Sequence, residues 1–303
     1  MKFDFMKNNL LHKAKNAFGL LANTYKHWMK HEPFQMSAAV SYYALFSFPA
    51  LLIIVIRTAG VFYEKSLVKD KITREISTML GKDAGTTIDT MLKSTVSDGD
   101  SQLFLILGVL TLLYGASGLF ISLQKSLNTI WEVTVKPKNE YLKMIKDRLF
   151  SLGIVVIIGF LLLISLVITT IINVLTGWIT DSFPNIVLYL VKIINFVVST
   201  GITTVLFAMI FKILPDVKLR WKYVWLGAFV TTLLFAIGKA GLSIYFGETN
   251  PASAFGAAGS VILLLLWVSY SCLILFFGAA FTHQYAKINK VNIETNIYAE
   301  ILK

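Results

Sequence analysis

Charged residues and cysteine are both scarce in this sequence. Charged side chains make up 15% of the 303 residues and hydrophobic ones 56%, with a mean hydropathy of +0.69. Water-soluble domains carry roughly 25% charged and about 45–50% apolar residues, so an ordinary soluble domain is excluded. The single cysteine, Cys272, lies in an apolar run. It leaves no disulfide within the chain and no cysteine-based metal site, and we interpret it as a packing residue.

Motifs for ATP hydrolysis and for metal binding are also missing. The sequence contains no G-x-x-x-x-G-K-[ST] loop and no H-E-x-x-H, so we predict no ATP motor, no metal and no cofactor. The nearest approach to a metal pair is His27 and His31, which share a helix face at i and i+4. Because only Glu32 is close to them in sequence, we interpret the pair as part of a solvated face.

The basic charge does not indicate a nucleic-acid partner. The net charge is +11, but the lysines and arginines gather in short segments beside apolar runs, as orientation signals of membrane proteins do. No basic stripe interleaved with stacking aromatics is found. We therefore expect membrane lipids, and no nucleic acid, as partners.

The sequence contains six long apolar segments. A span needs about 20 mostly apolar residues, and a helix satisfies the backbone of such a segment in lipid. The expected spans are residues 37–62, 102–124, 149–175, 186–211, 222–246 and 256–285. The sequence predicts an all-α, polytopic bundle of six transmembrane helices (37–286), with a cytoplasmic N-terminal segment (1–36) and a cytoplasmic tail (287–303).

The loops alternate in Lys and Arg content, which predicts the orientation. The N-terminal segment, the 2–3 and 4–5 loops and the tail are basic, whereas the 3–4 and 5–6 loops contain no Lys or Arg. Basic loops remain in the cytoplasm, so we expect both termini there. The first loop (64–100) carries both signs of charge, and its apolar residues recur near helical spacing on either side of Gly81–Gly85. It predicts a small helical extracytoplasmic cap.

Residues 7–30 have the pattern of an amphipathic helix. Apolar side chains such as Phe18, Leu21, Tyr25 and Trp28 fall on one side, and lysines fall on the other. Such a helix lies in the inner interface and is attracted by anionic lipid. The alternative is a helix packed against the cytoplasmic end of the bundle.

Two basic residues within spans are candidates for ligand contacts. Arg57 and Lys239 both fall toward the outer ends of their spans, and the spans contain essentially no Asp or Glu. Ionisable groups in lipid are costly and are commonly functional. The pair predicts an anionic ligand, such as a phosphate, a lipid headgroup or a carboxylate. Alternatively, each cation extends to the outer headgroups, as we expect for Lys192. The absence of acid disfavours an ordinary proton- or sodium-coupled pump.

Small residues and proline mark possible breaks in the spans. These are Pro49, the run from Gly115 to Gly118, and the run from Gly256 to Gly259. The run Gly115-Ala116-Ser117-Gly118 also matches the G-x-S-G around the serine of rhomboid-type intramembrane proteases, with His283 as the conceivable base. Close helix packing is the alternative for such a run.

Four stretches in order resemble the YihY/BrkB family of bacterial inner-membrane proteins. They are Ala38–Pro49, Tyr114–Trp131, Leu214–Asp216 followed by Trp221 and Gly238-Lys239, and Phe255–Ser260 followed by Leu266-Trp267. Ser41 stands where the family pattern has Ala. The resemblance implies six helices and a location in the cytoplasmic membrane. Its former label, ribonuclease BN, finds no support here, because the sequence shows no metal cluster and no acid/base constellation of a soluble nuclease.

The charges within spans, the possible helix breaks and the resemblance together give the candidate residues. The candidate substrate contacts are Arg57, Lys239, Tyr42, Tyr43, Ser47, Gln124 and Asn128, and the candidate structural or gating residues are Pro49, Gly115, Gly118, Trp131, Pro215, Asp216, Gly256 and Gly259. We expect Asp216 to cap the following helix or to pair with Lys218 or Lys222.

The leading hypothesis is a non-enzymatic transporter or flippase-like protein for an anionic or amphipathic substrate, including a lipid. One rival is an envelope-assembly scaffold that binds other envelope proteins without transport. A second is an intramembrane serine hydrolase that uses Ser117. The sequence leaves the substrate and the oligomeric state open.

Overall fold

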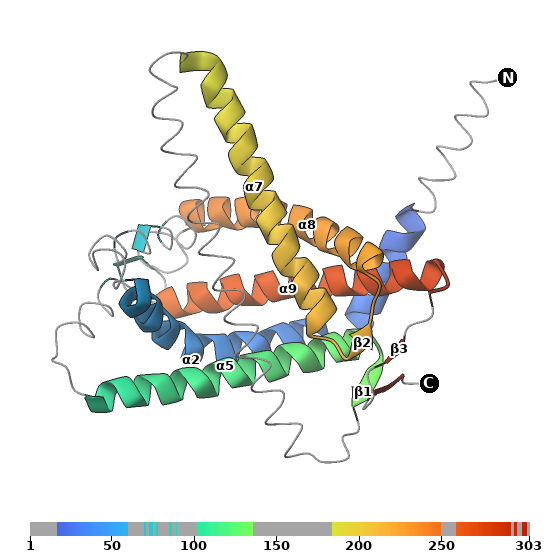
Figure 1. Cartoon of the computed structure of the whole chain (residues 1–303), viewed down its shortest axis with the longest axis horizontal. Helices are drawn as coiled ribbons and strands as arrows, with labels where there is room; N and C mark the ends of the chain where they lie inside the picture. Colours follow the sequence, from blue (N-terminus) through green and yellow to red (C-terminus); the bar gives the residue numbers. More distant parts are fainter. Residues whose placement is uncertain are drawn as a thin grey trace. The chain divides into compact units, whose positions relative to one another are not determined.

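The computed structural model describes residues 17–59, 102–135, 184–249, 259–291, 294–295 and 299–301, with a few positions between Asp70 and Asp89. Helices dominate these residues (Figure 1). Residues 17–30 are helical. The long helices are α2 (Pro33–Ala59), α5 (Gln102–Ile130), α7 (Pro184–Ile213), α8 (Trp221–Thr249) and α9 (Gly259–Ile288).

Three segments of these helices are long and apolar enough to cross a membrane, namely Phe196–Ile213, Trp221–Leu242 and Val261–Ile288. Proline begins α2 and α7, where the missing N–H costs nothing, because the first backbone amides of a helix have no partner within it. The helical, membrane-type character that the composition predicts is therefore confirmed.

The full count of six spans stays a prediction. Helices α2, α5, α7, α8 and α9 overlap five of the expected spans. The expected span 149–175 and most of the cap (64–100) lie outside the described residues, although the described cap positions are helical.

Four short strands, which the sequence did not predict, accompany the helices. Strand β1 (Val133–Val135) pairs antiparallel with β4 (Ala299–Ile301), and β2 (Val217–Lys218) pairs antiparallel with β3 (Glu294–Thr295). The β-branched run Val133-Thr134-Val135 favours extended backbone. The residues predicted as a plain cytoplasmic tail thus pair with the segments that follow α5 and α7.

The helices belong to two compact units. The first comprises Met1–His31, Leu127–Leu233 and Phe277–Lys303. Its core includes Leu127, Ile130, Phe211 and Val224, each with no exposed area. Deeply buried apolar side chains of this kind fix the ends of α5 and α7 relative to the start of α8 within this unit.

The second unit comprises Glu32–Ser126 and Leu234–Phe276. Small residues let its helices approach closely. Ser37 on α2 lies 3.1 Å from Ser269 on α9, measured between hydroxyl oxygens. A Cβ atom at Gly238 on α8 would overlap the ring of Tyr270 on α9. Close contact at small residues is the usual way in which membrane helices associate.

Candidate functional site

The C-terminal end of α5 is joined to the chain that follows α7 by a pair of hydrogen bonds. The side-chain amide of Asn128 donates to Oδ2 of Asp216 over 2.9 Å, and the backbone N–H of Asp216 donates to Oδ1 of Asn128 over 2.8 Å. Asn128 is buried. These two hydrogen bonds give Asn128 a structural role, because they fix the loop that contains Asp216. The sequence did not indicate Asn128 as the partner of Asp216.

Two further candidate residues of this region are buried in the packing of the first unit. Trp131 is 1% exposed and Pro215 is among the fully buried side chains. Gln124, one turn before Asn128 on α5, is half-buried. These positions fit the structural interpretation of Trp131 and Pro215.

The small-residue run on α5 packs against α2. A Cβ atom at Gly115 would meet the backbone N of Ser47 at 2.8 Å, and one at Gly118 would overlap the ring of Tyr43. Ser47 donates its hydroxyl hydrogen bond to the carbonyl of Ala44 over 3.1 Å. This geometry is that of close helix packing, the alternative to a protease motif at this run.

The structure describes some of the remaining candidate residues and leaves the side chains of others undescribed. Tyr42 is exposed. Lys239 on α8 is also exposed. Arg57 and Pro49 lie on α2, but the structure does not describe their side chains. Gly256 lies outside the described residues, and Gly259 begins α9. Whether Arg57 and Lys239 share a cavity therefore stays a prediction.

An apolar hollow of about 710 Å³ lies between α7 and α8 within the first unit. The residues that line it include Phe196, Gly201 and Val205 of α7 and Trp225, Phe229 and Leu233 of α8. Both helical segments are apolar enough to cross a membrane. Its volume is that of a small-molecule site, roughly 300–1,000 Å³. The sequence did not predict it, since it depends on how two helices cross.

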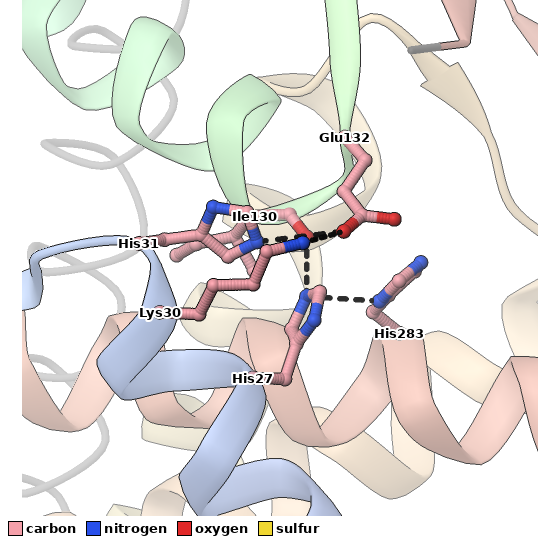
Figure 2. A network of polar contacts seen from close by, with 6 residues as sticks. All are labelled: His27, Lys30, His31, Ile130, Glu132 and His283. Carbon is pink, nitrogen blue, oxygen red and sulfur yellow. Dashed lines mark hydrogen bonds and ion pairs between the residues drawn. The ribbon is translucent and has the colours of Figure 1, made fainter. Parts of the chain in front are cut away.

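His27 corrects the prediction of a solvated histidine face. It is 8% exposed, and its Nε2 lies 2.8 Å from the carbonyl oxygen of Ile130 and 3.0 Å from Nδ1 of His283 (Figure 2). The ring centroid of His27 is 4.7 Å from that of His31 and 4.6 Å from that of His283. Three imidazoles thus meet in the first unit. His27 lies on the N-terminal helix, His31 in the turn after that helix, and His283 on α9.

Glu132 adds a carboxylate to these rings from the turn that follows α5. Its Oε1 lies 3.2 Å from Nζ of Lys30 and 3.7 Å from Nε2 of His31 (Figure 2). The backbone of Glu132 has a φ of 53°, a left-handed conformation that costs a residue with a Cβ roughly 1–2 kcal/mol. Glu32 and Lys290 have the same conformation, and each of the three residues lies just past a helix end, so the conformation is that of a left-handed helix C-cap.

Burial and charge set the ionisation of this cluster. Burial lowers the pKa of His31 from its ordinary value, and His27 lowers it further against the opposing effect of Glu132. Burial by itself would raise the pKa of Glu132, but the hydrogen bond and the positive charge of Lys30 outweigh it, so the pKa is lowered. At neutral pH the neutral imidazole of His31 therefore faces the ionised carboxylate of Glu132.

The sequence singles out His27 and His31 as a pair, but it predicts a solvated face for them. The spacing of His27 and His31 was the available signal, since residues four apart share a helix face. Glu132 and His283 lie more than a hundred residues away in sequence, so nothing local to the two histidines indicated them.

Comparisons with known proteins agree with the membrane character. A UPF0761 membrane protein of Alteromonas mediterranea is 24% identical over 279 residues, which cover 91% of this chain and 89% of that protein. The putative ribonuclease-like protein YfkH of Bacillus subtilis is 24% identical over 280 residues, covering 90% and 98%. A UPF0761 membrane protein of Verminephrobacter eiseniae is 26% identical over 178 residues, 58% of this chain but only 40% of that protein. No solved structure matches the chain.

The family comparison covers most of the chain. Residues 24–296 match the family described as virulence factor BrkB, and this range includes all four stretches that carry the resemblance to YihY/BrkB proteins. The chain is accordingly a multi-pass type of bacterial membrane protein, and it belongs to the virulence factor BrkB family.

Proposed function

We propose that the chain is a transporter or flippase-like protein of the bacterial cytoplasmic membrane that moves an amphipathic lipid, and that it is not an enzyme. The apolar hollow between α7 and α8 is the observation that carries this proposal. It lies within two segments that are apolar enough to cross a membrane. In a bilayer, a hollow between two such segments would face acyl chains, so a lipid tail is the ligand most available to fill it.

The lining of the hollow suits an acyl chain. Aromatic and branched aliphatic side chains make up nearly all of it, and Thr200 and Thr204 are the polar exceptions. The Thr204 hydroxyl donates to the carbonyl of Thr200 over 2.7 Å and lies 3.1 Å from the hydroxyl of Thr232 on α8, so its hydrogen bonds are made within the protein. A tail in this hollow would therefore gain apolar contact without displacing hydrogen bonds.

The charges at other positions support an anionic headgroup. Lys239 is an exposed cation on α8, and acid is nearly absent from the spans. An ammonium group at the rim of a bilayer attracts a phosphate. Arg57, on α2, is the second candidate for this contact.

The N-terminal helix supports a lipid-bound, cytoplasmic position for its segment. Phe18 is 75% exposed, and Leu21 and Tyr25 are also exposed, whereas Thr24 and His27 on the opposite side are buried. One side of the helix thus packs within the first unit and the other offers an apolar stripe. With the basic residues near it, this stripe fits the anionic inner leaflet.

A paired substitution at two glycines tests the lipid site. Gly201 lines the hollow, and a Cβ atom there or at Gly241 meets nothing within 4 Å. The first side-chain atom therefore has open space at both positions, but only Gly201 lines the hollow. The assay measures movement of a fluorescent phosphatidylglycerol between the leaflets of proteoliposomes, by bleaching of the outer label with dithionite.

We expect Gly201→Phe to slow lipid movement at least tenfold, while Gly241→Phe keeps the rate of the natural protein. Melting temperatures in detergent confirm that both variants fold. Equal rates in the two variants would remove the hollow from the pathway. Absence of movement in the natural protein, with co-purifying envelope proteins, would favour the scaffold.

A further inference from the structure

We propose that His27, His31 and Glu132 bind a divalent transition-metal ion of the zinc class, and that this ion fastens the N-terminal helix to the end of α5. The site is independent of lipid movement. None of its ligands lines the hollow between α7 and α8.

The donor atoms are close enough for one ion. The ligand atoms of His27, His31 and Glu132 all lie within 4.8 Å of one another. Two donors on one zinc ion are at most about 4.2 Å apart, since each bond is roughly 2.0–2.2 Å long. Small side-chain rotations therefore suffice to close the set. Two imidazoles and one carboxylate are a common zinc donor set, with a fourth position left for water or another ligand.

Hydrogen bonding leaves one of these atoms without a partner. Nε2 of His31 is buried and accepts or donates no hydrogen bond among the described residues. The nearest carboxylate oxygen, Oε1 of Glu132, is 3.7 Å away, beyond hydrogen-bond distance. Such a separation suits two ligands of a shared cation better than a direct contact.

His27 is placed at the centre of the cluster by two neighbours. Its Nε2 lies near the carbonyl oxygen of Ile130 and near Nδ1 of His283, at 2.8 and 3.0 Å (Figure 2). A single ring nitrogen cannot satisfy both contacts with full strength, since it carries one proton or one lone pair. A cation bound at Nε2 would use its lone pair and so would replace both contacts, and the proton of the ring would then reside on Nδ1. His283 lies beside the ion as the third imidazole of the cluster, outside the three-ligand set.

Lys30 is the group that opposes metal binding. Its Nζ lies 3.2 Å from the same Oε1 that faces His31, so it holds the place of a cation in the metal-free protein. The Lys30 side chain is 68% exposed and can move into solvent without losing packing. Removal of Lys30 should therefore strengthen metal binding, an outcome that a purely structural hydrogen-bond cluster does not produce.

The test is a zinc titration of the full chain, purified in detergent without a histidine tag and stripped with a chelator. We expect one saturable Zn²⁺ per chain and a rise in melting temperature on binding. Co²⁺ in its place should give the intense visible bands of tetrahedral coordination. His31→Asn and Glu132→Gln should each weaken Zn²⁺ binding at least tenfold, and Lys30→Met should tighten it at least threefold.

The matched control is Glu32→Gln. Glu32 has the same residue type as Glu132 and a similar left-handed φ of 50°, but it is not among the three ligands. It should bind Zn²⁺ as the natural protein does. Melting curves without metal show which variants fold, and Lys30→Met, which alters an exposed side chain, keeps the test valid if His31→Asn does not fold. Absence of saturable Zn²⁺ binding would exclude the site. The site would also be excluded if His31→Asn, Glu132→Gln and Lys30→Met all bound Zn²⁺ with the affinity of the natural protein.

Discussion

Gly227 on α8 faces Thr282 on α9 with no room between them for even a methyl group. The relationship is reciprocal one turn further on, where Gly278 on α9 faces Thr231 on α8 in the same way. Each threonine donates its hydroxyl hydrogen bond to the glycine four residues before it, over 2.7 Å. The two helices of the first unit thus interlock through two Gly–Thr pairs, and both threonines have no exposed area.

Replacement of Gly227 by alanine should destabilise the protein. The added Cβ would overlap the hydroxyl oxygen of Thr282, which is held by its own hydrogen bond. Overpacking of this kind costs about 1–3 kcal/mol, so the melting temperature in detergent should fall by several degrees. Gly241→Ala is the control, because a Cβ atom there meets nothing within 4 Å, and its melting temperature should remain that of the natural protein or rise.

The double variant identifies the clash as the cause. In Gly227→Ala/Thr282→Ala the opposing hydroxyl is gone, so the two changes should cost less together than the sum of their separate effects. Additive losses would show that Gly227 matters for a reason other than its contact with Thr282.

Asn128→Ala should lower stability rather than change recognition of a substrate. The variant leaves the carboxylate and the backbone N–H of Asp216 without the partners described here, and a lost buried partner costs about 1–3 kcal/mol. Asp216→Asn should be milder, because an amide oxygen still accepts from Asn128. Thermal melting measures both. If Asn128→Ala instead melted at the normal temperature and had a raised KM for lipid, Asn128 would be a substrate contact.

The helices were predictable from the sequence because their signal is local. A run of about 20 apolar residues defines a span whatever lies elsewhere in the chain, and Pro33 and Pro184 mark helix starts by their own chemistry. The strands were missed because β1 and β4 have three residues each and exist only as a pair. Isolated segments of this length carry too little pattern to be recognised.

The sites depended on contacts between distant parts of the chain. The family resemblance marked both Asn128 and Asp216, yet the bond between them joins positions 88 residues apart. Glu132 approaches His31 only because α5 ends there and the backbone turns through a left-handed residue that is not glycine. No sequence rule predicts that conformation for a glutamate, since it is rare outside glycine, asparagine and aspartate.

Lys239→Gln should reduce movement of an anionic lipid in proteoliposomes. The exposed ammonium group on α8 attracts a phosphate, and glutamine keeps similar length without the charge. Lys239→Arg, which keeps the charge, should restore the rate. Lys218→Gln is the control, because Lys218 is an exposed lysine on β2, outside the apolar segments. If none of the three substitutions altered the rate of lipid movement, the role of Lys239 would be limited to contact with lipid headgroups.

Ser117→Ala should leave the function unchanged, because the run around it packs helices. Its neighbours Gly115 and Gly118 contact Ser47 and Tyr43 on α2. His283, the residue a hydrolase would need as its base, already has Nδ1 within 3.0 Å of His27, and its ring lies 5.2 Å from that of Trp131 between centroids. A fluorophosphonate probe, which labels activated serines, should not modify the natural protein.

Gly118→Ala separates packing from chemistry at the same run. It adds one methyl group against the ring of Tyr43 and leaves Ser117 in place, so it should lower the melting temperature where Ser117→Ala does not. The opposite ranking, with probe labelling that disappears in Ser117→Ala, would identify Ser117 as a nucleophile. We expect the first result, because a Cβ atom at position 118 would overlap the Tyr43 ring, which would have to shift against α5.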